Sequence, residues 1–246
     1  TMAVGQRLYG PNAPYGHCEW GGPETLRRLT PADLSRFYRS RLARPEAIGL
    51  VAVGDITMDE LLAALEKSLA DWKTDEPHAA RVALPPVPAA KPTSIVLIDR
   101  PGAAQSVIEV ARIGAARKTP DYFAICLMNA AFGGQFSSRL NMNLREDKGY
   151  TYGAKSVFEW RVREPGPMMA FASVQTKVTA PALAEFLNEM KGMAGGRPID
   201  AAELDFCRKF LVRGYAAGFE TPSNLAMQLE TCMTHGLPDD YFDTVV

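Results

Sequence analysis

Two side chains in the segment SSRLNMNLREDKGYTYGA, residues 137–154, carry groups that could act on a peptide bond. Arg145 offers a planar guanidinium with five N–H donors, and Tyr152 offers a phenolic hydroxyl. Donors of this kind stabilise a carbonyl oxygen that gains negative charge, and they also bind peptide carbonyls. Gly149 lies between them and suits a tight turn. We therefore predict that both side chains face one space, as candidate catalytic and substrate-binding residues.

Arg145 also has a purely structural interpretation, which the pattern leaves open. It falls in the last turn of a helix predicted over residues 137–147, where a cation can pair with helix carbonyls that lack partners. Tyr152 begins the next predicted strand, so the two side chains can share a space across the turn. Four neighbours are interpreted as a solvated helix surface: Arg139, Glu146, Asp147 and Lys148. The pattern assigns no role to Tyr150.

The sequence on its own offers no metal site. It contains three histidines, His17, His78 and His235, and four cysteines, Cys18, Cys126, Cys207 and Cys232. No two histidines have the spacing of a helical metal-binding pair, and none lies beside a cysteine or carboxylate at ligand spacing. The cysteines form no CxxC pair, which favours buried free thiols. We therefore expect this chain to bind no metal itself.

Charge and motif content argue against several functional classes. The 246 residues include 27 basic and 28 acidic side chains, whereas a general nucleic-acid or membrane-surface binder would show a basic excess. No apolar run reaches the roughly 18 residues that a membrane span requires. The sequence has no GxSxG, Walker or GxGxxG motif, and the glycines of FGGQF, residues 132–136, are interpreted as a helix stop. We expect no nucleic-acid partner and no membrane span.

The elements that must position these residues fall into two predicted parts. A proline-rich stretch over residues 74–92 predicts an extended linker. Before it, in residues 1–73, the pattern predicts a helix over 31–42, a buried strand over 47–54 and a helix over 58–72. That strand would lack a partner within its part, so residues 1–73 are interpreted as an incomplete domain.

The second part, residues 93–246, is predicted to be a fuller domain, with or without truncation at its C-terminal end. Strands are predicted over 94–99, 105–115, 151–162 and 167–177, and helices over 121–132, 137–147, 181–194, 201–219 and 222–234. Adjacent strands joined by short turns favour an α+β fold, with a mainly antiparallel sheet covered by helices.

The segment FGGQFSSRLNMNLREDKGYTYGA resembles the second-domain motif of the M16 (insulinase or pitrilysin) zinc metallopeptidase family. That motif has a Gly-Gly, a Ser-Arg-Leu, and then Leu-Arg-Glu-x-x-Gly-x-x-Tyr. Each part is present here: Gly133-Gly134, Ser138-Arg139-Leu140, Leu144-Arg145-Glu146, Gly149 and Tyr152. Upstream, APYGHCEWG is similar to the family's HPYG loop, with Ala13 in place of its histidine. Residues 29–72 are similar to the helix–strand–helix that closes the family's first domain.

The resemblance implies an M16 metallopeptidase-like fold in which two halves supply different parts of the active site. Family members pair homologous α+β domains into halves that enclose a chamber, and zinc sits in an inverted HxxEH with a distal glutamate in the catalytic half. An arginine and a tyrosine from the other half reach the substrate, and by motif match these are Arg145 and Tyr152. HxxEH is absent from this sequence. Zinc is therefore expected only in the parent polypeptide or a partner half.

These implications lead to one main expectation and one alternative. The chain is expected to be part of an M16 zinc metallopeptidase, or its non-zinc partner half, that binds peptide substrates and is inactive alone. Its expected partners are the peptide and the zinc-bearing half, with self-association as a further possibility because an incomplete domain exposes apolar surface. The alternative is a non-catalytic M16-like structural or binding subunit of a larger assembly. Bacterial relatives are often periplasmic or envelope-associated, which is the expected localisation.

Overall fold

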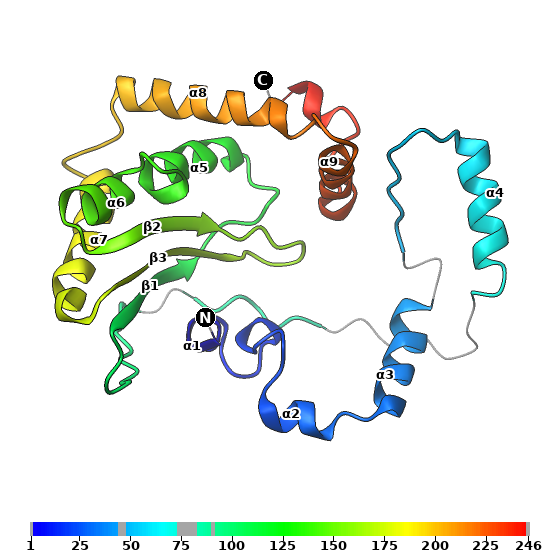
Figure 1. Ribbon diagram of the computed structural model, residues 1–246, viewed down its shortest axis with the longest axis horizontal. Helices are drawn as coiled ribbons and strands as arrows, with labels where there is room; N and C mark the ends of the chain where they lie inside the picture. Colours follow the sequence, from blue (N-terminus) through cyan, green and yellow to red (C-terminus); the bar gives the residue numbers. More distant parts are fainter. Residues whose placement is uncertain (1, 44–47, 73–82, 90–91, 245–246) are drawn as a thin grey trace. The chain divides into compact units, whose positions relative to one another are not determined.

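The computed structural model describes residues 2–43, 48–72, 83–89 and 92–244, and Figure 1 labels its elements. The chain divides into two compact units. One combines Thr1–Gly16 with Pro86–Gly214, and the other combines His17–Pro85 with Tyr215–Val246. The candidate residues Arg145 and Tyr152 both belong to the first of these units.

The first unit is built on a three-stranded antiparallel sheet. The strands are β1 (Gln105–Ile113), β2 (Thr151–Phe158) and β3 (Pro167–Gln175), in the order β1-β3-β2. On the central strand, Val174, Ala172, Ala170 and Met168 are buried and alternate with more exposed residues. This alternation is the signature of a sheet that packs one face against a core.

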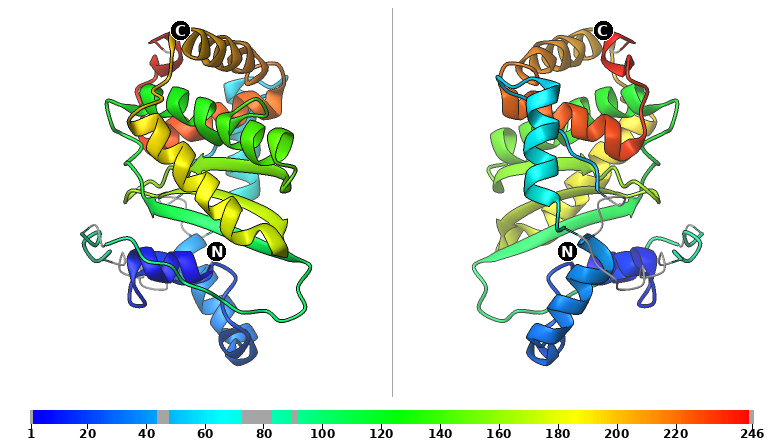
Figure 2. Two further views of the ribbon diagram at one scale, coloured as in Figure 1. Left: turned by 90° about the vertical axis from the view of Figure 1, so that its left-hand side faces the viewer. Right: turned by 90° about the vertical axis from the view of Figure 1, so that its right-hand side faces the viewer.

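Helices cover the buried face of the sheet (Figures 1 and 2). In chain order they are α5 (Tyr122–Asn129), the π-helical turn η4 (Ala130–Gly134), α6 (Arg139–Asn141), the π-helical turn η5 (Met142–Asp147) and α7 (Thr179–Ala194). A further helix, α8 (Ala201–Ala217), packs on this helical layer through Cys207. Leu140, Leu144 and Phe186 are fully buried against the strands. Burial of each such side chain contributes about 1.5–3 kcal/mol. The mainly antiparallel, helix-covered α+β fold predicted from sequence is confirmed.

Three short helical segments complete the first unit. Two lie near the N-terminus, α1 (Met2–Tyr9) and the 3-10 turn η1 (Pro14–Gly16), and the third is the 3-10 turn η6 (Thr176–Val178), which follows β3. The phenol of Tyr9 donates a hydrogen bond of 2.9 Å to the carbonyl of Pro165. This contact ties α1 to the loop between β2 and β3.

In its described residues, the second unit forms helices and no strands. It holds α2 (Pro23–Arg28), α3 (Pro31–Phe37), η2 (Tyr38–Leu42), α4 (Met58–Leu69), α9 (Pro222–His235) and η7 (Tyr241–Thr244). Thr57 and Glu60 form the predicted capping box at the start of α4, in which each side chain bonds the other's backbone N–H. Gly236 ends α9 in a left-handed conformation with φ 56°.

Two predicted strands do not form. Residues 48–54 and 94–99 have no strand assignment, and the side chains of Ile95 and Leu97 are 79% and 85% exposed. A strand needs a neighbour to bond its backbone groups, and β1, β2 and β3 are the strands of the described sheet. Much of the predicted linker, at residues 74–82 and 90–91, lies outside the described residues. The predicted domain boundaries at 73 and 93 stay predictions.

Candidate functional site

The turn between Arg145 and Tyr152 is set by Gly149. This glycine has φ 65°, the left-handed conformation that residues with a Cβ rarely adopt. The chain reverses there, and the Tyr150 N–H donates to the Leu144 carbonyl at 2.9 Å. Arg145 consequently stands in the last turn of η5, and Tyr152 is the second residue of β2.

Arg145 is held against an aromatic ring. The carbon of its guanidinium lies 4.6 Å from the centre of the Phe136 ring, and its Nε is 3.3 Å from the Glu146 carboxylate. Both charged side chains are partly exposed, so the ion pair is worth little in water. The guanidinium thus lies over an aromatic ring and retains donors that a ligand can use.

Tyr152 faces the open side of the sheet because β2 contains a bulge. Ala154 pairs with Ala172 and Thr151 pairs with Val174, so two residues of β2 lie opposite the single residue Ser173. Without the extra residue, Tyr152 would stand opposite Val174, on the buried face. The tyrosine side chain is instead 91% exposed. Its hydroxyl bonds to no other residue in the described part of the chain.

Two asparagines from the helical layer bind the outer edge of β2. The Asn141 Oδ1 accepts the Ala154 N–H at 3.1 Å, and the Asn129 Nδ2 donates to the Ser156 carbonyl at 3.3 Å. The Ser156 hydroxyl also donates to the Asn129 Oδ1 at 2.7 Å. These are the backbone groups that a neighbouring strand would use, so side-chain amides cap this edge.

The Gly-Gly pair ends its helix as predicted, and it also permits a close approach that sequence reasoning missed. A Cβ at Gly133 would lie 2.6 Å from the Ser156 amide nitrogen, and a Cβ at Gly134 would lie 2.7 Å from the Asn129 Nδ2. Both contacts are shorter than packed atoms allow. The two glycines therefore let the end of η4 approach β2 and keep the Asn129–Ser156 bonds in place.

Arg139 corrects an expectation from sequence. It is not on a solvated surface, because its side chain is only 15% exposed and forms a two-pronged ion pair with Glu203, with distances of 2.7 and 2.5 Å. It also donates to the carbonyls of Arg197 and Pro198. The carboxylate of Glu203 raises the pKa of the Arg139 guanidinium further. Arg139 therefore fastens α6 to the start of α8.

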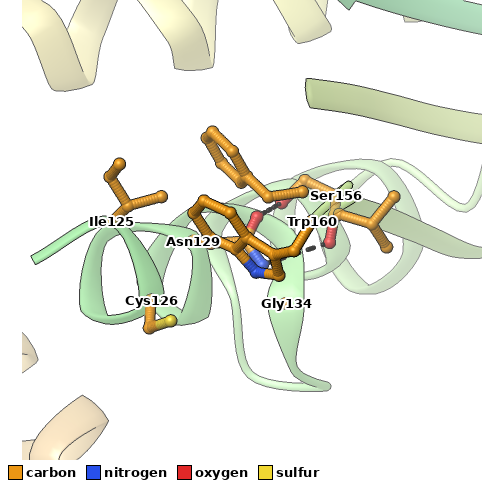
Figure 3. Close-up of a pocket in the computed structure, with 8 residues that line it drawn as sticks. Ile125, Cys126, Asn129, Gly134, Ser156 and Trp160 are labelled. Atoms are coloured by element: carbon orange, nitrogen blue, oxygen red, sulfur yellow. Dashed lines mark hydrogen bonds between the residues drawn. The ribbon is translucent and has the colours of Figure 1, made fainter. Parts of the chain in front are cut away.

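A separate cavity lies at the other end of β2 (Figure 3). Its volume is about 230 Å³, and it is lined by Ile125, Cys126, Asn129, Gly134, Ser156, Val157, Phe158 and Trp160. Burial raises the pKa of the Cys126 thiol, which keeps it protonated and a weak nucleophile. Gly134 of the motif lines this cavity but Arg145 and Tyr152 do not, so the cavity is separate from those two donors.

The described residues contain no group of three histidine, cysteine or carboxylate side chains that could hold a metal ion. His78 lies outside the described residues. All four cysteines are free, and Cys207 is the buried one. None of the described helices combines the length and apolar character that crossing a membrane requires. The site therefore consists of hydrogen-bond donors, with no zinc ligands beside them.

Comparisons with known proteins agree with the motif. The family model described as "Peptidase M16 inactive domain" matches residues 28–211. An uncharacterized zinc protease of Streptomyces coelicolor is 32% identical over 155 residues, which cover 61% of this chain and 32% of that protein. The structure is similar to a peptidase M16 inactive domain from Pseudomonas fluorescens, with a TM-score of 0.79, 25% identity, and coverage of 98% of this chain and 56% of that one.

A more distant solved structure shares the fold. The periplasmic protease PqqL from Escherichia coli has a TM-score of 0.71 and 18% identity, and the match covers 98% of this chain and 26% of that one. The chain therefore spans about a third of the curated relative and just over half of the Pseudomonas fluorescens structure.

Proposed function

The chain belongs to the M16 peptidase family, in its inactive domain, and we propose that it binds peptide substrates and stabilises the transition state of their hydrolysis within a zinc metallopeptidase. One observation carries the proposal. A guanidinium on an aromatic platform and an exposed phenol flank a single glycine turn, at Arg145 and Tyr152. Neither donor is buried, so both remain accessible to a substrate.

The proposed chemistry is donation of hydrogen bonds to a carbonyl oxygen as it becomes negatively charged. The Tyr152 O–H and the Arg145 N–H groups would bind the substrate carbonyl weakly and the oxyanion more strongly, which lowers the barrier. Asn129 and Asn141 cap the outer edge of β2. A peptide would therefore reach Tyr152 across the open face of the sheet rather than as the next strand on β2.

Zinc does not fit the described residues, which contain no cluster of metal ligands. We propose that zinc is bound by another half, in the same polypeptide or in a separate subunit. This chain alone is then expected to bind peptides without cleaving them. The test is to measure hydrolysis of fluorescein-labelled casein by the complete protein with its zinc-bearing half, and by this chain alone. Cleavage by this chain alone, with no partner present, would contradict the proposal.

A second candidate function is a structural or binding subunit without a catalytic role. It is favoured by the description of the matched family domain as inactive. The same assay separates the two functions when it is repeated with Arg145→Ala and Tyr152→Phe. Unchanged casein hydrolysis in both variants would support the non-catalytic role, because such a subunit needs neither donor.

We also propose a location in the cell envelope or periplasm. The support is the similarity to a protease that is described as periplasmic, which by itself shows a shared fold. Fractionation of the source cells, followed by detection with an antibody against this chain, tests the location. Recovery of the protein solely with cytoplasmic markers would contradict it.

A further inference from the structure

We infer that Asn141 is a positioning residue that sets where Arg145 and Tyr152 stand relative to each other. The inference rests on the proposed function of those two donors and adds a residue whose side chain bonds Phe136 and Ala154. Asn141 bridges the segment that supports the guanidinium and the strand that carries the phenol.

The first arm of the bridge runs toward Arg145. The Asn141 Nδ2 donates a hydrogen bond of 2.7 Å to the backbone carbonyl of Phe136. The ring of Phe136 is the platform under the Arg145 guanidinium. Fixing the Phe136 backbone limits where the ring can lie, and the ring in turn limits where the guanidinium can lie.

The second arm runs toward Tyr152. The Asn141 Oδ1 accepts the N–H of Ala154 at 3.1 Å, at the residue where regular pairing with β3 resumes after the bulge. The bulge is what turns Tyr152 to the open face. Thr151 holds the other end of the bulge, because its hydroxyl donates to the Ser173 carbonyl at 2.7 Å. Asn141 thus fixes the end of the bulge that faces the helices.

The chemistry of the two arms requires an amide. A backbone carbonyl can only accept and a backbone N–H can only donate, so the bridging group needs one donor and one acceptor at fixed spacing. Asn141 is 4% exposed, so water cannot easily replace either bond. Leucine has a similar shape and offers neither group. Aspartate offers the acceptor, but it can donate only when it is protonated.

This requirement gives a pH signature that a merely structural role would not produce. In Asn141→Asp, an ionised carboxylate would face the Phe136 carbonyl and repel it. Burial and that carbonyl both favour the protonated acid, which can donate to Phe136 and accept from Ala154. The ratio of the variant's kcat to the wild-type kcat should therefore rise as the pH falls from about 8 to about 6.

The experiment compares variants in the complete protein with its zinc-bearing half, with fluorescein-labelled casein as substrate. Asn141→Leu should lower kcat by about 10- to 100-fold with little change in KM, because the donors are misplaced for the transition state. Hydrogen exchange of the amides at 152–154 should become faster. The matched control is Asn143→Leu in the same helical segment, since the Asn143 side chain donates to Glu185 and Glu189 on α7 and not to Phe136 or β2. Its kcat should stay within about twofold of wild type.

The outcomes separate this inference from the proposed function. If Arg145→Ala and Tyr152→Phe lose activity while Asn141→Leu retains it, the positioning role is wrong and the proposed function stands. The positioning role is also wrong if both asparagine variants lose equal activity, or if the Asn141→Asp ratio does not change with pH. If the wild-type protein cleaves no casein, both proposals fail.

Discussion

The guanidinium of Arg145 stacks on the ring of Phe136, with 4.6 Å between the guanidinium carbon and the ring centre. Both residues flank the SRL segment, and Phe136 is itself partly exposed. A long arginine side chain loses less conformational freedom on binding when its head already rests on a surface. The ring contact therefore limits the freedom of the guanidinium before a ligand binds, while the ion pair with Glu146 engages its Nε.

Removing the platform should weaken the site modestly. Phe136→Ala is expected to lower kcat/KM for casein by about 2- to 5-fold, the value of a partly exposed cation–π contact. Phe136→Tyr keeps the ring and should retain the wild-type value within about twofold. Steady-state kinetics on both variants of the complete protein provide the measurement. Equal losses in the two variants would show that the ring does not act through stacking.

Loss of either donor, Arg145 or Tyr152, should lower kcat far more than loss of the Phe136 ring. Tyr152→Phe removes one O–H and leaves the ring, and Arg145→Lys keeps the charge while losing the planar fork. Each should lower kcat by about 10²–10³-fold, the range for losing one oxyanion donor. Lys191→Ala serves as the control, because Lys191 is exposed on α7 and not on β2. A loss of less than about twofold in either donor variant would refute the catalytic role.

The close approach of Gly133 to Ser156 predicts that a larger residue at position 133 destabilises the fold. In Gly133→Ala the new methyl group would meet the Ser156 backbone at 2.6 Å, so the end of η4 must move away from β2. We expect the free energy of unfolding to fall by about 1–3 kcal/mol, measured by urea denaturation. Gly214→Ala in α8 is the matched control, since no atom lies within 4 Å of its added Cβ. It should be neutral or stabilising by up to about 1 kcal/mol.

The capping box of α4 predicts an acid-sensitive helix start. Hydrogen bonds from the Thr57 backbone N–H and hydroxyl lower the pKa of the Glu60 carboxyl. A carboxyl whose pKa is lower in the folded state stabilises folding above its ordinary pKa near 4.5, and this contribution disappears as the pH falls through the lowered value. An NMR titration should show the shift in wild type.

A Thr57→Val substitution isolates the part that the hydroxyl contributes, because valine keeps the backbone N–H that is the larger cause. Valine has the shape of threonine without the hydroxyl, so the pKa of Glu60 should return toward its ordinary value. The protection of the amides in the first turn of α4 against hydrogen exchange should then vary less between pH values near 5 and near 3. An unchanged Glu60 titration in the variant would show that the hydroxyl bond does not contribute.

Local patterns predicted the helices and turns well, because the causes are local. Thr57 and Glu60 are three residues apart, and the turn at Gly149 depends on one backbone conformation. The small and apolar residues of 167–177 likewise predicted a strand, which the structure forms as β3. Residue types alone left a purely structural role for Arg145 open. The M16 motif then singled out Arg145 and Tyr152 as candidate site residues.

The errors came from contacts between residues distant in sequence. Arg139 meets Glu203, 64 positions away, and no local pattern distinguishes it from a solvated arginine. The segment at 94–99 has the composition of a strand, yet no described strand pairs with it. The bulge at Tyr152 depends on the register with β3, so sequence predicted the strand but not the face that the tyrosine occupies.

The two amides on β2 also limit how molecules of this protein could polymerise. A fibre built by joining sheets end to end needs two receptive sides on every copy, and the Asn129 and Asn141 side chains block one of them. A second copy is therefore hindered from adding a strand at β2, because these two amides already bond the Ala154 N–H and the Ser156 carbonyl.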